Sequence, residues 1–165
     1  MKLYIEQKVF SIGDKFRIMD AEGQTRFTVE GQIFSLGKKL HIYDENHTEQ
    51  AVLVQKLLTL LPKFELEVNG GQNCTISRKM ALFHSAFETS YPQWKVTGNF
   101  TGHDYQFEGS NGTAASVHKK WMSWGDSYEV DIADEADALY VIGVVLAIDA
   151  VLEADNAAAA SSASN

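Results

Sequence analysis

Short stretches in which hydrophobic and polar residues alternate follow one another along residues 1–132. Residues 16–19 (FRIM) and 64–68 (FELEV) show this two-residue period clearly, which is typical of strands in a sheet with one buried and one solvent-exposed face. Candidate strands are residues 2–7, 15–20, 26–30, 39–43, 51–56 and 64–68, followed by runs around Thr75, Phe87, Trp94, Tyr105, Val117 and Tyr128. Turn-forming segments such as NGG and SNG separate the runs, so we predict about twelve antiparallel strands joined by hairpins.

A long apolar segment replaces the alternating pattern after Ile132. Residues 136–152 (ADALYVIGVVLAIDAVL) are apolar on every face, and a helix of this kind lies either in a protein core or in a bilayer. Roughly 16 helical residues span only about 24 Å, less than the roughly 30 Å hydrocarbon core of a membrane. We therefore predict a buried central helix over residues 135–153 and no transmembrane segment. Asp134, Glu135 and Asp137 suit its first turn, where Asp134 can cap free amides.

The strands that precede the apolar helix provide its enclosure. A helix is about 10 Å across, and a barrel of about twelve strands has room for it where about eight strands would enclose side chains alone. We predict a mainly β fold, a closed antiparallel barrel of about twelve strands wrapped around its own hydrophobic C-terminal helix, in a single domain of residues 1–155. Gly143 would permit close approach of the helix to the barrel wall. The low-complexity composition of residues 156–165 predicts a disordered tail.

The chain also contains a weak internal repeat. A shift of 64 positions aligns residues 51–68 with residues 115–132, so that Lys56 meets Lys120 and FEL meets YEV. The copy number is too low for a solenoid or a propeller. We predict two related half-sheets, each a meander of hairpins.

The overall charge and the cysteine content restrict the compartment and the partners. The net charge of −8 opposes nonspecific attraction to nucleic acid, so we expect no nucleic-acid partner. The one cysteine, Cys74, cannot form an intramolecular disulfide, and the N-terminal segment MKLYIEQKVF lacks the apolar stretch of a secretory signal. We therefore expect a cytoplasmic location.

No catalytic motif is recognisable along the chain. The histidines, His41, His47, His84, His103 and His118, lack the paired spacing of metal ligands, and no Gly-x-Ser-x-Gly nucleophile elbow occurs. We expect no enzymatic activity, no metal and no cofactor.

Adjacent basic residues are the best candidates for a binding site. There are three such pairs: Lys38-Lys39, Arg78-Lys79 and Lys119-Lys120. If barrel closure brings any two pairs to one rim, they would form an anion site for phosphate or a phospholipid headgroup. The alternative is that lysines at strand edges and turns promote solubility. The acids before the helix suggest a second hypothesis, a weak calcium site, although their position also explains them as helix-start residues.

Two blocks of sequence carry a family resemblance. The C-terminal block is KKWMSWGDSYEVDI at residues 119–132 followed by LAID at 146–149, and the N-terminal block contains QKVF, FRIMD, VEG and KKLHIYD between residues 7 and 44. In these blocks the chain resembles the LURP-one-related family and its bacterial YxjI-like members, over residues 1–155. The resemblance implies a tubby C-terminal-like fold, a barrel around a central hydrophobic helix, which is more distantly similar to phospholipid scramblases. It implies no enzyme, and tubby domains bind a phosphoinositide headgroup through basic residues.

Together these observations predict a non-enzymatic binding or scaffold protein whose ligand the sequence does not identify; an anionic headgroup, phosphate and a protein partner are the candidates. Two alternatives remain open from the sequence. One is a scramblase-like, membrane-associated lipid protein, and the other is an enzyme whose site is assembled by the fold without a linear motif.

Overall fold

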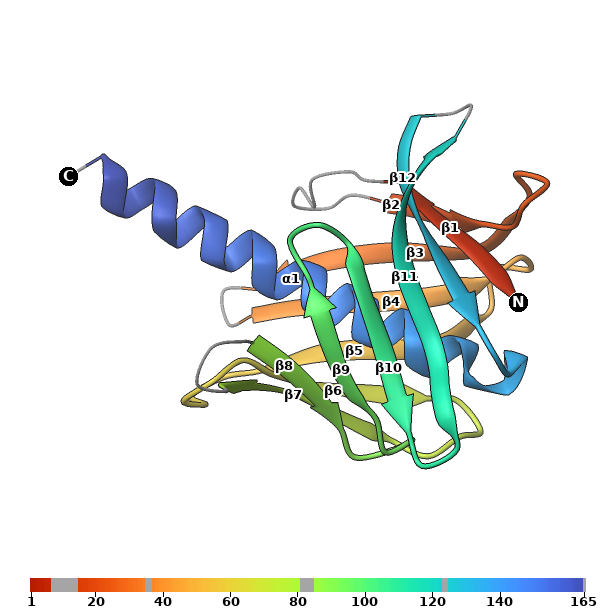
Figure 1. The fold of residues 1–165 in the computed structure, drawn as a ribbon, viewed down its shortest axis with the longest axis horizontal. Helices are drawn as coiled ribbons and strands as arrows, with labels where there is room; N and C mark the ends of the chain where they lie inside the picture. Colours follow the sequence, from red (N-terminus) through yellow and green to blue (C-terminus); the bar gives the residue numbers. More distant parts are fainter. Residues whose placement is uncertain (7–14, 35–36, 81–84, 123–124, 165) are drawn as a thin grey trace.

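The structure is a closed antiparallel barrel with a helix along its axis (Figure 1). It is a computed structural model that describes residues 1–6, 15–34, 37–80, 85–122 and 125–164. The strands are β1 (Lys2–Glu6), β2 (Lys15–Met19), β3 (Thr25–Phe34), β4 (Gly37–Asp44), β5 (Glu49–Lys56), β6 (Lys63–Val68), β7 (Cys74–Met80), β8 (Ser85–Thr89), β9 (Lys95–Asn99), β10 (Asp104–Gly109), β11 (Gly112–Met122) and β12 (Gly125–Ile132). Each strand pairs with its sequence neighbours, and β1 pairs with β12, Leu3 opposite Val130, to close the barrel. The predicted antiparallel barrel is confirmed.

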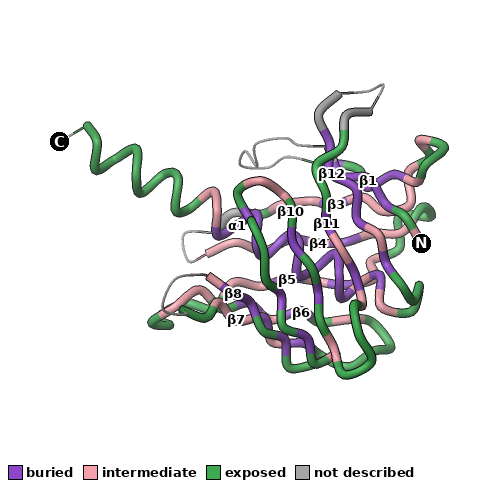
Figure 2. The backbone as a smooth tube through the Cα atoms, viewed as in Figure 1, coloured by how far each residue is buried: buried purple, intermediate pink, exposed green. Residues whose placement is uncertain are grey.

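The two-residue period places alternate side chains inside the barrel. In β6, Phe64 and Leu66 are buried whereas Lys63 and Glu67 are exposed. The inward-facing residues of the strands and the apolar residues of the helix form one continuous core. Figure 2 shows this core as the buried helix segment surrounded by half-buried strands. Burial of apolar area at both surfaces of contact stabilises the barrel and the helix together.

The central helix, α1 (Ala138–Ala163), follows a short 3-10 turn, η1 (Glu135–Asp137). The carboxylate of Asp134 accepts a 3.0 Å hydrogen bond from the amide of Ala136, which confirms the predicted cap. Between Ala138 and Val151 every residue except Leu139 is buried, as expected for a helix enclosed on all sides. Gly143 lies against the wall at β6, where an added Cβ would come within 2.6 Å of a Leu66 methyl carbon.

The helix continues past the predicted end at residue 153 and leaves the barrel (Figure 2). Residues 156–163, whose composition predicts disorder, form further turns of exposed helix. Residues 157–160 are all alanine, and alanine has the highest helix propensity of the amino acids, which accounts for the continuation. The helix therefore has an enclosed part and an exposed extension.

The internal repeat is visible in the strand register. Ala51 lies opposite Val68 in the β5–β6 hairpin, and the equivalent residues, Ala115 and Ile132, lie opposite each other in the β11–β12 hairpin. The aligned residues thus occupy the same places in two hairpins of one barrel. The predicted repeat holds at the level of these hairpins.

The two ends of the barrel differ in charge. We call the end where α1 begins the start end; it carries the loops after the even-numbered strands. The odd-numbered strands end at the exit end, where α1 leaves the barrel (Figure 1). Acids occupy the described loops and strand ends at the start end: Asp20, Glu22, Asp44, Glu45, Asp134, Glu135 and Asp137. Basic residues gather toward the exit end: Lys15, Lys38, Lys39, Lys56, Lys63, Arg78, Lys79, Lys119 and Lys120.

Candidate functional site

All three basic pairs identified in the sequence lie at the exit end of the barrel. The strand β4 begins there with Lys38-Lys39, and β7 and β11 end there with Arg78-Lys79 and Lys119-Lys120. The strands β5 and β6 separate the first two pairs, whereas β8 to β10 separate the second from the third. Closure of the barrel therefore gathers the pairs at one rim without forming a single six-residue cluster.

Within each pair the two side chains point in opposite directions, because successive residues of a strand face opposite sides of the sheet. The members that share the face of the buried core residues are Lys38, Arg78 and Lys119. The members that face the outside are Lys39, Lys79 and Lys120. Adjacent basic residues thus do not act as a pair on one ligand, and the exit end presents an inner and an outer set of cations.

Two of the inner cations hold the exposed extension of α1. Lys38 Nζ forms an ion pair with Glu153, and Arg78 Nη1 lies 2.8 Å from Asp155 Oδ2. Arg78 also donates a 3.2 Å hydrogen bond to Ser85. The helix is therefore fixed to opposite parts of the β4–β7 wall as it leaves the barrel.

The outer face of β4 to β7 carries a continuous row of lysines at the exit end. We call these residues the lysine row: Lys39, Lys56, Lys63 and Lys79. Lys56 and Lys63 lie directly opposite each other, Lys39 is the diagonal neighbour of Lys56, and Lys79 is the diagonal neighbour of Lys63. Diagonal neighbours in a sheet are about 7–8 Å apart, and like charges directly opposite each other are destabilising. The row therefore concentrates positive charge at a cost in stability.

Neighbouring carboxylates only partly balance the lysine row. Lys56 Nζ lies 3.1 Å from Glu65, and Lys79 Nζ lies 3.6 Å from Glu88. Each pair is substantially exposed, and surface pairs of this kind contribute little to stability. The lysines can exchange these partners for another anion at small energetic cost.

The outer cation of β11 belongs to a structural network instead. Lys120 Nζ lies 3.4 Å from Glu129, which also accepts 2.8 Å hydrogen bonds from Lys2 and Tyr4. Burial of Glu129 opposes ionisation, but these hydrogen bonds outweigh it and lower the pKa of its carboxyl to about 2. Glu129 is therefore ionised and fully occupied, and it ties β1, β11 and β12 together across the seam that closes the barrel.

A buried polar cluster lies inside the barrel near the exit end. The hydroxyl of Tyr128 donates a hydrogen bond to Asp149 on α1. Among the described residues, Asp149 Oδ1, Tyr105 Oη and His103 Nδ1 have no hydrogen-bond partner. Burial raises the pKa of Asp149 to about 7, although the Tyr128 hydrogen bond and the charge of Lys38 oppose the shift. Asp149 is therefore mostly protonated well below pH 7 and becomes charged as the pH rises through that value.

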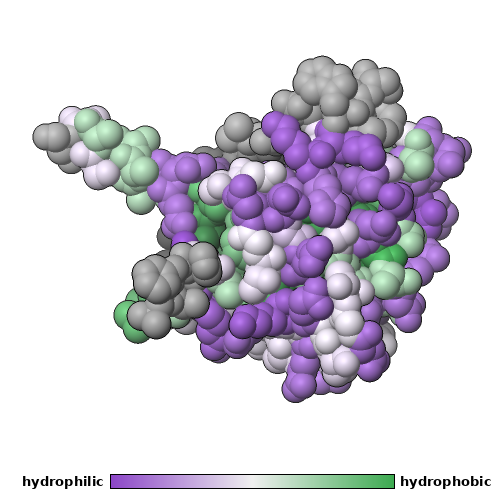
Figure 3. Space-filling view, viewed as in Figure 1, coloured by the Kyte–Doolittle hydropathy of each residue, from purple (hydrophilic) through white to green (hydrophobic). Residues whose placement is uncertain are grey.

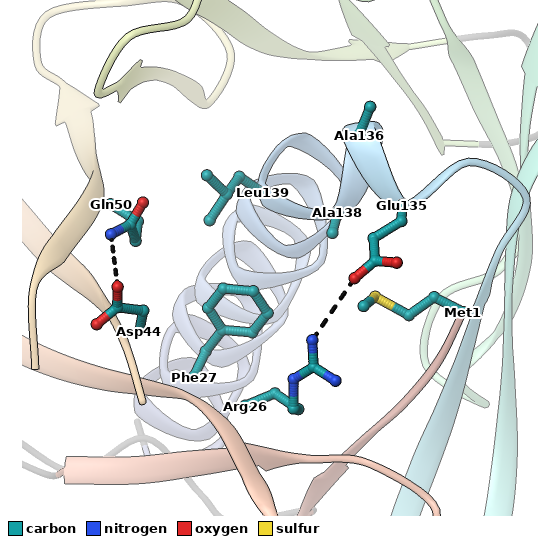
Figure 4. Close-up of a pocket in the computed structure, with 9 residues that line it drawn as sticks. All are labelled: Met1, Arg26, Phe27, Asp44, Gln50, Glu135, Ala136, Ala138 and Leu139. Carbon is teal, nitrogen blue, oxygen red and sulfur yellow. Dashed lines mark hydrogen bonds and ion pairs between the residues drawn. The ribbon is translucent and has the colours of Figure 1, made fainter. Parts of the chain in front are cut away.

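The start end contains a pocket of about 260 Å³ beside the first turn of α1 (Figure 4). Arg26 reaches across it to Glu135, 3.5 Å away, and the amide of Gln50 donates a 2.8 Å hydrogen bond to Asp44. Phe27 lies between these two pairs in Figure 4. The polar side chains that line the pocket thus pair with one another, and the guanidinium of Arg26 lies beside the carboxylate of Glu135.

A larger pocket of about 740 Å³ lies between the β8–β9, β10–β11 and β12–α1 connections. Its lining combines Tyr91 and Trp94 with amide and hydroxyl side chains and with Asp134 and Asp137, and it contains no lysine or arginine. Burial and the neighbouring Asp134 raise the pKa of Asp137. The larger pocket is therefore acidic, and the lining of the smaller pocket combines Arg26 with the carboxylates of Asp44 and Glu135.

The acids before the helix do not form a calcium site in the part of the chain that the structure describes. There, no group of three or more His, Cys, Asp or Glu side chains converges on one point. Two of the acids before the helix have structural partners: Asp134 caps η1 and Glu135 pairs with Arg26. No helix within the described residues is long and apolar enough to span a bilayer.

The comparisons with known proteins agree with the geometry. The model of the family described as LURP-one-related matches residues 1–149, which include the described strands and α1 as far as Asp149. The chain belongs to the LURP-one-related family. It is 36% identical over 155 residues to the uncharacterized protein YxjI of Bacillus subtilis (strain 168), covering 94% of this chain and 96% of that protein. An X-ray structure of an Arabidopsis thaliana protein shares the fold, with a TM-score of 0.55 and 15% identity over 87% of this chain and 88% of that one.

Sequence reasoning missed half of the lysine row. Lys56 and Lys63 are isolated in the sequence, so a search for adjacent basic residues passes over them. The signal that would have found them is the predicted β5–β6 hairpin, because its register places the two lysines opposite each other. The adjacent pairs, in contrast, drew attention to three residues on the inner face of their strands, of which Lys38 and Arg78 form ion pairs with the helix.

Proposed function

We propose that this LURP-one-related protein is a non-enzymatic binding protein that attaches to anionic phospholipid headgroups through the lysine row. The observation that carries this proposal is the direct juxtaposition of Lys56 and Lys63. A like-charge pair costs stability, and a surface anion would relieve that cost. Phosphate groups are suitable partners because lysines bind them as mobile point charges.

The separation of acidic and basic residues between the two ends of the barrel allows the exit end to face a membrane despite the net charge of −8. The longest strand, β11, has 11 residues and spans roughly 35 Å at about 3.3 Å per residue. The acids at the start end therefore lie well beyond the screening distance of about 10 Å at moderate salt when the exit end faces a membrane. A negative surface then interacts mainly with the local positive charge.

The test is co-sedimentation with vesicles of phosphatidylcholine containing phosphatidylserine, compared with vesicles of phosphatidylcholine alone. Lys63→Glu should reduce binding to the anionic vesicles by roughly 30-fold, because one basic residue contributes about 1 kcal/mol at such a surface and charge reversal removes about twice that. Lys95→Glu is the matched control: the same change at an exposed position of the start end. Equal binding by both variants, or no binding by the wild type, would contradict the proposal.

A further inference from the structure

The loop between β5 and β6, residues 57–62 (LLTLLP), exposes apolar side chains in the middle of the lysine row. Leu58 is 106% exposed, Leu60 is 100% exposed and Leu57 is 44% exposed. Met80, at the exit end of β7, is 70% exposed. Among the described residues, the other large exposed hydrophobic side chain is Tyr91, at the start end. Figure 3 shows a hydrophobic patch at the lower left margin, where Figure 1 places this loop.

The structure of the loop directs these leucines away from the protein. Leu58 has a φ of 58°, in the left-handed region that disfavours residues with a side chain. The C-terminal end of the loop is fixed, because the amide of Arg78 donates a 3.0 Å hydrogen bond to the carbonyl of Pro62. Just before the loop, the side-chain oxygen of Gln55 in β5 accepts a 3.1 Å hydrogen bond from the amide of Lys38. A strained, anchored loop that presents leucine to water is unusual in a chain whose core is otherwise well covered, and it indicates a partner surface.

The surroundings of the loop decide which partner it fits. Lys56 immediately precedes the loop and Lys63 immediately follows it, so positive charge flanks the leucines on both sides. A bilayer that contains anionic lipids offers phosphates to the lysines and hydrocarbon to the leucines at the appropriate depths. We infer that the β5–β6 loop is a membrane wedge, which inserts Leu58 and Leu60 below the headgroups while the lysine row stays among the phosphates. This inference rests on the proposed headgroup binding and adds its mode.

High salt separates the contribution of the lysine row to vesicle binding from that of the leucines. Charge attraction is screened at high salt, whereas the transfer of apolar side chains out of water is not. Leu58→Ser combined with Leu60→Ser should weaken binding to anionic vesicles at high salt by roughly tenfold for each leucine. The folded state should be unaffected, because both side chains are already fully exposed, and an unchanged melting temperature checks this. Thr59→Ser, a change in the same exposed loop that leaves the leucines in place, is the control.

A fluorescent probe reports the insertion directly. Leu58→Cys can be labelled with the environment-sensitive dye NBD, since Cys74 is fully buried and its thiol pKa is raised by burial. Addition of phosphatidylserine-containing vesicles should shift the NBD emission to the blue and protect the dye from aqueous iodide. An unshifted, quenchable dye on protein that nevertheless co-sediments would overturn the wedge and leave the headgroup proposal standing. A wild-type dimer that the double serine variant abolishes would instead identify a second copy as the partner, and absence of all vesicle binding would refute both proposals.

Discussion

Asp149 offers the sharpest test of the enclosed helix, because its carboxyl lies inside the barrel with one oxygen unpartnered. We expect Asp149→Asn to stabilise the protein at neutral and alkaline pH. The asparagine keeps a carbonyl oxygen that can accept the hydrogen bond from Tyr128, and it removes the charge whose burial raises the pKa of Asp149 from 3.8 to about 7. The substitution therefore isolates the cost of ionising this carboxyl.

Proton linkage determines whether the stability of the wild type rises or falls with pH. Between the pKa of the unfolded state, near 3.8, and the folded pKa of about 7, the folded wild type retains a proton that the unfolded chain has lost. Stability of the wild type therefore falls as pH rises through this window, by about 1.4 kcal/mol per pH unit, and reaches a total of about 4 kcal/mol. The neighbouring groups His103, Tyr105, Tyr128 and Lys38 are present in both proteins, so their titrations largely cancel in the difference.

Urea unfolding of both proteins at a series of pH values measures the effect. The stability advantage of Asp149→Asn should be near zero at about pH 4 and should grow to about 4 kcal/mol at about pH 8. Asp155→Asn, the same substitution on the extension of the helix, is the control: it removes a negative charge and an exposed ion pair with Arg78 but leaves the buried carboxyl in place. A difference that does not change with pH, or a variant less stable throughout, would show that the carboxyl is ionised and compensated in the folded protein.

Two further predictions concern the helix. Val144→Asp places a carboxylate at a fully buried position and should abolish cooperative folding. The control, Ala158→Asp on the exposed extension, should change the melting temperature little. A soluble Val144→Asp protein with an unchanged melting temperature would refute the buried position of the helix. Glu153→Gln combined with Asp155→Asn removes the carboxylate partners of Lys38 and Arg78 at the exit end and should strengthen co-sedimentation with phosphatidylserine-containing vesicles by roughly 30-fold, at about 1 kcal/mol for each of the two cations. Unchanged binding would show that these cations do not face the membrane.

The sequence predicts the architecture well because the relevant signals are periodic. Alternation in segments such as FELEV determines which side chains face the core, and the apolar segment around Val144 has no polar face to expose. The close approach of the helix to the wall at Gly143 is also predictable, since a helix enclosed on all sides packs closely against the barrel and glycine has no side chain to prevent it. The extent of the helix was predicted less well, because the alanine-rich segment is compatible with disorder by composition and with helix by propensity.

The candidate site was harder to predict because it depends on register and exposure. Lys56 and Lys63 become neighbours only when a particular hairpin forms with a particular pairing. The leucines between them resemble any other apolar run in the sequence, and nothing in LLTLLP by itself distinguishes a buried turn from an exposed one. Asp149 likewise appears as a single polar residue in an apolar segment, and its partner, Tyr128, lies 21 residues away on β12.

The position of α1 also constrains how the chain is made. The helix leaves the ribosome after all the strands, yet it occupies the innermost place in the molecule. Before the helix is synthesised, the strands have no apolar core to pack against. Before β12 is synthesised, β1 also lacks the strand with which it closes the barrel. Contacts between the two ends of the chain must then form late, which favours slow folding and prolonged exposure of sheet edges. Nascent chains should therefore depend on chaperones until the enclosed part of the helix has left the ribosome.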